Sequence, residues 1–211
     1  MIKQEKILII SPHTDDAELG CGGTISRFIR ERKRIYWVVF STAEDSLPVG
    51  FEKDTLRKEF EEVINEFGLE EYKIYSFKVR YIHEKRQEIL EELIKIRKEF
   101  APDLVISPSL NDFHQDHIAV ANECIRAFKT NASIICYELP WNHINFNTLQ
   151  FIKLNEKDME KKWKVLQKYK TQLLKQRNYF SEEYIKGLAR VRGTQCNSKY
   201  AEAFEVIRWI V

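Results

Sequence analysis

Apolar positions along the chain follow two alternating patterns. Short apolar runs of strand length are separated by longer segments in which apolar residues step by three and four. Strands that alternate with helices are typical of βαβ units, so the pattern predicts an α/β three-layer sandwich with a mostly parallel sheet and helices on both faces. The expected strands are Lys6–Ile10, Ile35–Ser41, Lys73–Phe77, Leu104–Ser107, Ile134–Leu139, Phe151–Leu154 and Phe204–Ile210.

Four stretches carry the helical spacing. Their apolar stripes run from Leu56 to Phe67, Ile89 to Phe100, Ile118 to Phe128 and Met159 to Leu173. Gly68 and Pro102 stand where the first two helices are expected to stop. Because no internal repeat, low-complexity tract or linker divides the chain, we expect residues 1–211 to form a single domain.

Composition and charge narrow the class of protein. A hydrophobic share of 44% and a charged share of 31% are those of an ordinary globular protein. The net charge of +2, without a basic face, gives no reason to expect a nucleic acid partner, and no apolar run approaches the length of a membrane span. The four cysteines are scattered without a CxxC pair, which favours a reduced, cytoplasmic protein.

Two polar clusters follow strands of the predicted sheet. "SPHTDDAELGCGG" comes after the first strand, and "SPSLNDFHQDHIAV" comes after Leu104–Ser107. Ligands of open α/β sheets bind beyond the carboxyl ends of the strands. We therefore expect the two clusters to meet in a single crevice.

The residue types in these clusters indicate a metal site. His13 and Asp16 would supply an imidazole and a carboxylate, and either His114 or His117 would supply a second imidazole. Two histidines and one carboxylate, with positions left open, suit a catalytic Zn²⁺. The same set also suits Fe²⁺ or another divalent metal, so the ligand types alone do not choose the ion.

Three further polar residues of the clusters have separate expected roles. Asp15, beside Asp16 but off the metal, would act as general base toward a metal-bound water. His114 would donate a hydrogen bond to an oxyanion that forms on the substrate. Asp116 would hold one of the imidazoles in its tautomer.

The glycines after the first strand allow another interpretation. A glycine-rich turn at this place cradles pyrophosphate in dinucleotide-binding folds. However, Gly20, Gly22 and Gly23 do not make a GxGxxG pattern, and position 25 is Ile. The glycines more simply let the following helix pack closely on the sheet. A nucleotide-sugar or dinucleotide-binding module without hydrolytic activity remains the alternative function, beside a metal-holding scaffold without activity.

Two motifs resemble those of a known family. "PHTDDAELGCGG" resembles the (P/A)HPDDxxxGxGG signature of the LmbE-like, or PIG-L-type, N-acetylglucosaminyl deacetylases, and "HQDH" resembles their HxDH motif. Thr14 replaces the usual proline, which removes no ligand. The later segments "LRKEFEEVINEFGL", "KKWKVLQKYKTQ" and "YAEAFEVIR" are also similar to segments of the family.

The resemblance implies a fold, a site and a reaction. The fold is Rossmann-like, and the reaction is zinc-dependent hydrolysis of the linear amide of an N-acetylglucosamine-type amino sugar conjugate, a small molecule. The implied site has His13, Asp16 and His117 as metal ligands, Asp15 as general base and His114 facing the oxyanion. Arg57 is similar in position to an arginine that anchors substrate hydroxyls, with Arg80 and Arg192 as alternatives. The group joined to the sugar and the oligomeric state, a homo-oligomer included, stay open.

Overall fold

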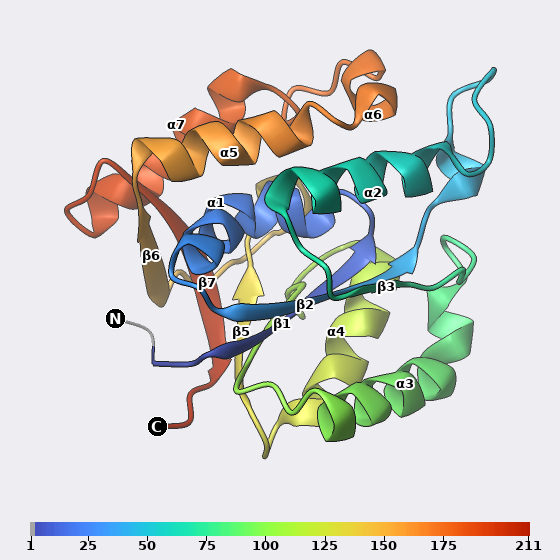
Figure 1. Ribbon diagram of the computed structural model, residues 1–211, viewed down its shortest axis with the longest axis horizontal. Helices are drawn as coiled ribbons and strands as arrows, with labels where there is room; N and C mark the ends of the chain where they lie inside the picture. The colour runs from blue at the N-terminus through green and yellow to red at the C-terminus, as the bar shows by residue number, and fades with distance from the viewer. Residues whose placement is uncertain (1–2) are drawn as a thin grey trace.

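The apolar runs expected to be strands are joined in one mixed sheet (Figure 1). The computed structural model describes residues 3–211, and within them the seven strands have the order β3-β2-β1-β4-β5-β7-β6. Each expected range overlaps an observed strand, so the predicted fold class is confirmed. The strands are β1 (Lys6–His13), β2 (Arg34–Ser41), β3 (Tyr72–Ile74), β4 (Leu104–Ser107), β5 (Ser133–Tyr137), β6 (Gln150–Leu154) and β7 (Tyr200–Arg208).

The sheet is parallel except at one edge. Strands β3, β2, β1, β4 and β5 pair in parallel. Strand β7 lies antiparallel between β5 and β6. An antiparallel edge on a parallel sheet is common in α/β proteins, and it leaves the carboxyl ends of the parallel strands on one side of the molecule.

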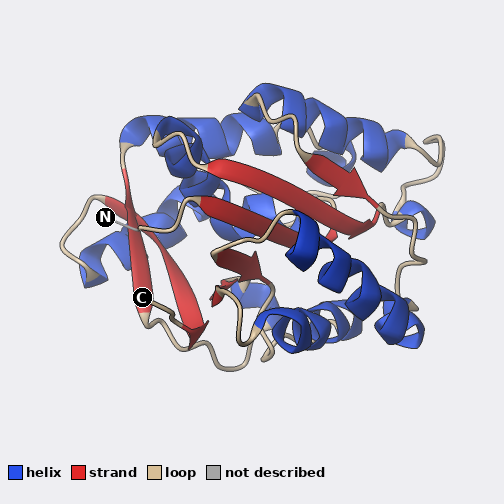
Figure 2. Cartoon of the chain, turned by 60° about the horizontal axis from the view of Figure 1, so that its bottom comes forward, coloured by secondary structure: helices blue, strands red, loops and turns tan. Residues whose placement is uncertain are grey.

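Helices cover both faces of the sheet (Figures 1 and 2). Helices α1, α2, α5 and α7 share one apolar core with the sheet, and α3 and α4 share the other. Among residues 3–211, no helix is both long and apolar enough to cross a membrane. The helices are α1 (Asp16–Arg30), α2 (Thr55–Phe67), α3 (Arg86–Glu99), α4 (Gln115–Phe128), α5 (Glu156–Leu166), α6 (Lys170–Leu174) and α7 (Glu182–Gln195).

The two cores follow from the alternation of side chains along the strands. In β1, Ile7 and Ile9 point into the core that contains α1, while Leu8 and Ile10 point into the core that contains α3 and α4. All four side chains are fully buried. A strand that is buried on both faces has a continuous apolar sequence. The run "ILII" therefore predicted β1 clearly.

Helix α1 packs tightly against the sheet at its glycines. A Cβ on Gly20 would lie 2.4 Å from Cδ2 of Tyr137, and one on Gly23 would lie 2.5 Å from Cδ1 of Leu154. The helix kinks at Cys21, and the freed backbone N–H of Gly23 donates to the carboxylate of Glu202 at 3.0 Å. The glycines therefore allow α1 to pack closely against core side chains, as the sequence suggested.

The topology brings the two polar clusters together. Strand β1 ends at His13 and α1 begins at Asp16, whereas β4 ends at Ser107 and α4 begins at Gln115. Because β1 and β4 pair in parallel, the segments that follow them leave the same edge of the sheet.

Candidate metal centre

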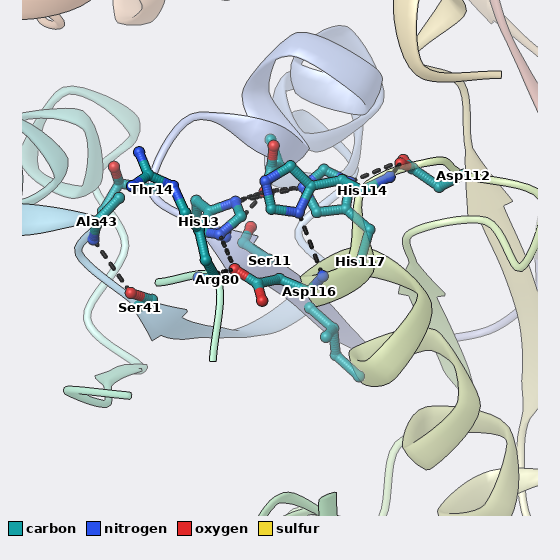
Figure 3. Close-up of polar contacts among 12 residues, drawn as sticks. Ser11, His13, Thr14, Ser41, Ala43, Arg80, Asp112, His114, Asp116 and His117 are labelled. Atoms are coloured by element: carbon teal, nitrogen blue, oxygen red, sulfur yellow. Dashed lines mark hydrogen bonds and ion pairs between the residues drawn. The ribbon is translucent and has the colours of Figure 1, made fainter. Parts of the chain in front are cut away.

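Three donor atoms, from His13, Asp16 and His117, form a small triangle beyond the end of β1. Figure 3 shows the rings of His13 and His117 close together. Oδ2 of Asp16 lies 3.2 Å from Nδ1 of His13 and 3.2 Å from Nε2 of His117, and the two nitrogens are 3.3 Å apart. Donors that are each ~2.0–2.1 Å from a tetrahedral ion lie about 3.3 Å from one another. The three side chains are buried, and their spacing fits one ion the size of Zn²⁺.

Each histidine of the triangle is held by a carboxylate on its other nitrogen. Nδ1 of His117 lies 2.7 Å from Oδ2 of Asp112, and Nε2 of His13 lies 3.0 Å from Oδ2 of Asp116. A ring nitrogen that donates to a carboxylate leaves the opposite nitrogen with its lone pair free for a metal. Both rings therefore present the nitrogen that faces the triangle.

Asp112 is a residue that the sequence reasoning missed. Besides His117, its carboxylate accepts the backbone N–H of His114 at 2.7 Å, and it is almost fully buried. An aspartate two residues before the first histidine of the HxxH pattern is a signal for such a turn. Its contact with His117 depends on how the loop folds back, which the sequence does not show.

Asp116 is fully buried and links the site to the backbone of Arg80. Its Oδ2 accepts the N–H of Arg80 at 2.7 Å in addition to its contact with His13. His13, His114 and Asp116 also lie close enough to share an ion. In that set, however, Nδ1 of His114 already accepts the N–H of Asp116 at 3.2 Å, and Oδ2 of Asp116 already has two partners. The triangle with Asp16 and His117 is therefore the better site.

His114 presents an N–H to the cavity. Since its Nδ1 accepts a hydrogen bond from the backbone, the ring proton resides on Nε2 in the neutral form. Burial, with His117 and His13 nearby, lowers the pKa of His114, which keeps the ring neutral at neutral pH. The ring stacks on that of His117 with their centroids 4.7 Å apart, which fixes its direction.

The two aspartates differ in charge preference, although they are adjacent. Burial and the neighbouring Asp16 raise the pKa of Asp15 to about 6. Burial opposes ionisation of Asp16 too, but His117 and His13 lower the pKa of its carboxyl below the ordinary value. Burial alone would lower the pKa values of His13 and His117, yet their carboxylate partners raise them to about 9 and about 10.

A cavity of about 260 Å³ opens over the triangle. Asp15 and His114 line it together with the three donor residues, and Arg80 is also in the wall. Arg57 does not line the cavity: its side chain is exposed on α2, and its Nε donates to Glu61 at 3.1 Å. Arg192 is also elsewhere, because it pairs with Glu138 at 2.9 Å. This placement does not support Arg57 as the substrate anchor.

Comparison with known proteins identifies the family. A family model described as "PIG-L: GlcNAc-PI de-N-acetylase" matches residues 8–128, more than half of the chain. The chain belongs to this family. The matched range contains the whole candidate metal centre. A relative among curated proteins, the uncharacterized deacetylase YaiS of Escherichia coli K12, is 26% identical over 174 residues, which cover 80% of this chain and 92% of that protein.

Solved structures with the same fold include proteins of more than one activity. The conserved protein TT1542 of Thermus thermophilus has a TM-score of 0.80 at 21% identity, covering 98% of this chain and 96% of that one. The N,N'-diacetylchitobiose deacetylase of Pyrococcus horikoshii has a TM-score of 0.76 at 19% identity, covering 97% and 84%. GalB of Pseudomonas putida, a 4-carboxy-2-hydroxymuconate hydratase, has a TM-score of 0.78 at 18% identity, covering 98% of each chain. The fold alone therefore does not choose the reaction.

Proposed function

We propose that this chain is a metal-dependent hydrolase that removes the N-acetyl group from an N-acetylglucosamine-type amino sugar conjugate. The observation that carries the proposal is the donor triangle with two further groups, Asp15 and His114, lining the same cavity. A metal-dependent hydrolase of amides combines an ion with a base and an oxyanion donor, and the family of the chain supports this chemistry.

His13, Asp16 and His117 would hold the ion. Two imidazoles and one carboxylate, with a fourth position open to the cavity, are the donor set of catalytic zinc, so Zn²⁺ is our first choice and Fe²⁺ the alternative. A divalent ion bound there would acidify a water and polarise the acetyl carbonyl. Asp112 and Asp116 would keep the two histidines in the tautomers that binding needs.

Asp15 would act as the general base. Its carboxyl lines the cavity and is not part of the donor triangle. A base works best with a pKa close to the operating pH, and burial beside Asp16 raises the pKa of Asp15 to about 6. Asp15 would take a proton from the water that attacks the carbonyl carbon. It would then return that proton to the sugar nitrogen as the C–N bond breaks, releasing acetate and the free amine.

His114 would stabilise the oxyanion. The Nε2–H of the neutral ring is a donor within the cavity, and its direction is fixed by the stack on His117 and by the bond from the Asp116 N–H. A donor that is oriented before the reaction stabilises developing charge without reorganisation. Losing one such donor typically costs about 10²–10³ in kcat.

Acetate release from a panel of N-acetylated glycosides tests the proposal. The zinc-loaded chain should release acetate and free amine in equal amounts from at least one of them, and a chelator should abolish the reaction. Release of acetate that is indifferent to chelation would contradict the metal role. A chain that releases none, but binds nucleotides without metal, would fit the binding-module alternative instead.

A further inference from the structure

Part of the cavity wall is cationic. Three basic side chains line it among the described residues: Arg80, Lys175 and Arg177. Within residues 3–211, none of the three forms an ion pair with a carboxylate. Basic side chains elsewhere commonly do, as in the pairs Lys162–Glu202 and Arg192–Glu138. Basic groups that gather in a cavity without carboxylate partners retain their capacity to bind an anion.

In the part of the chain that the structure describes, the side chains of the three cations donate hydrogen bonds to neutral groups only. Nζ of Lys175 donates to the carbonyl of Ser46 at 3.0 Å, and Nη2 of Arg80 donates to Oγ of the same serine at 3.3 Å. Arg177 donates to the hydroxyl of Tyr179. An ammonium has three donors and a guanidinium has five, so each side chain keeps free N–H groups.

The backbone has a left-handed, energetically unfavourable conformation in both segments that carry these cations. Arg80 has φ +69° and Gln176, between Lys175 and Arg177, has φ +48°. This left-handed region disfavours side chains with a Cβ, and such residues persist where the surroundings fix them, often at functional sites. Arg80 is fixed on both sides: its N–H donates to Asp116 at 2.7 Å, and its carbonyl accepts Nε2 of Gln115 at 2.5 Å.

The positive charges of Lys175 and Arg177 lie close together in the cavity wall. Burial and the neighbouring Arg177 lower the pKa of Lys175, which indicates that the two cations repel each other. Asp15 attracts both cations, and Glu59 also attracts Lys175. Glu59 already accepts two hydrogen bonds from Thr171, and Asp15 is the base in the proposed reaction. An anionic group of a ligand would reduce this repulsion, and Asp15 would remain available as the base.

We propose that the substrate is an anionic amino sugar, with a phosphate or carboxylate group that binds Arg80, Lys175 and Arg177 while its acetamide lies at the donor triangle. This inference names the substrate class and rests on the proposed function. The cavity of about 260 Å³ is near the lower limit of small-molecule sites, ~300 Å³, which suits one sugar ring with a compact anionic group.

Binding of product-like amines tests the anion site without turnover. The probes are glucosamine 1-phosphate, glucosamine 6-phosphate and the carboxymethyl glycoside of glucosamine, with methyl glucosaminide as the neutral probe. Calorimetry on the zinc-loaded chain should show at least one anionic probe binding at least about tenfold more tightly than the neutral one, the typical value of a hydrogen bond to a charged group. The phosphate and carboxylate arms identify which anion is preferred.

Variants separate this site from direct binding of the anion to zinc. Arg177→Met, Lys175→Met and Arg80→Met should each weaken the preferred anionic probe by ~10–100-fold and leave the neutral probe unchanged. Lys98→Met removes the same charge from the exposed side of α3 and should change neither. Circular dichroism checks that each variant is folded. If one variant does not fold, the other two still test the proposal.

Two results would overturn the proposal. One is a neutral probe that binds as tightly as every anionic probe, and the other is anion affinity that survives all three substitutions. Acetate release from the N-acetylated forms of the same probes is measured in parallel. If none releases acetate while anion binding depends on the three cations, the deacetylase function fails and the anion site stands.

Discussion

Two neighbouring aspartates have different surroundings at the end of β1. Asp16 contacts both histidines of the donor triangle, which stabilise its negative charge. Among residues 3–211, the side chain of Asp15 forms no ion pair or hydrogen bond with another side chain, and burial beside Asp16 disfavours its charge. A single step along the chain therefore separates a candidate ligand from a candidate base, since Asp16 is the one in contact with both imidazoles.

Asp112→Asn should weaken metal binding. The amide cannot hold the proton of His117 Nδ1 as a carboxylate does, and losing such an outer partner typically costs about 10–100-fold in metal affinity. Competition with a coloured zinc chelator measures the change. Asp54→Asn, at an exposed position before α2, is the matched control and should bind metal as the wild type does. Unchanged affinity in Asp112→Asn would show that Asp112 does not support the site.

The sequence contained most of the site but not all of its partners. The candidate ligands His13, Asp16 and His117 could be found because they lie in short motifs that follow strands. Asp112 could not, because its contact depends on the path of a loop. Arg57 as a substrate anchor stays a prediction, and its place outside the cavity lining has a geometric reason: Leu56 is buried and lines the cavity, and the next residue on a helix points about 100° away.

Among the helices and strands, those with large buried apolar residues could be predicted from the sequence. Strands β1, β2, β4 and β5 are mostly buried and apolar, so their runs were clear. Strand β3 is partly exposed, and the range expected for it ran past its end at Ile74. Helix α7 was missed because its buried positions are Ile185, Ala189 and Gly193, a stripe with two small residues. The stripe from Met159 to Leu173 suggested one helix, but α5 ends at Leu166 and α6 begins at Lys170, since apolar spacing continues across a short break.

Gly20→Ala should destabilise the fold. The new Cβ would lie 2.4 Å from the ring of Tyr137, and overpacking of this kind costs about 1–3 kcal/mol. Urea unfolding measures the free energy of unfolding. Gly187→Ala in α7 is the control: nothing lies within 4 Å of its Cβ position, so it should stabilise the helix by up to about 1 kcal/mol. Equal effects of the two substitutions would contradict the packing argument.

At the scale of the whole molecule, the site joins two distant parts of the chain. His13 and Asp16 follow β1, and His117 lies in the first turn of α4, after β4. The pairing of β1 with β4 brings them together, so the candidate metal centre depends on the topology of the sheet. An ion there would bind the folded chain and not the unfolded one, and it would stabilise the fold accordingly.

The metal-free chain should lose stability as pH rises, and metal loading should release protons. The pKa values of His13 and His117, raised to about 9 and about 10, exceed the value of 6.5 expected in the unfolded chain. Their contribution is therefore full below pH 6.5 and is lost as pH rises through 9 to 10.

Because the ion needs unprotonated nitrogens, zinc binding at about pH 7 should release protons, with a heat that depends on the ionisation enthalpy of the buffer. A heat independent of the buffer would contradict these protonation states.

The division of roles between Asp15 and Asp16 is the centre of this account, and one paired measurement tests it most directly. Zinc content and the rate of acetate release are determined on the same samples of wild type, Asp15→Asn and Asp16→Asn. We expect Asp15→Asn to keep one zinc per chain and to lose at least ~10²-fold in kcat, the usual contribution of a general base. Asp16→Asn should lose the zinc as well as the rate. Zinc-loaded Asp15→Asn that turns over at the rate of the wild type would contradict the account.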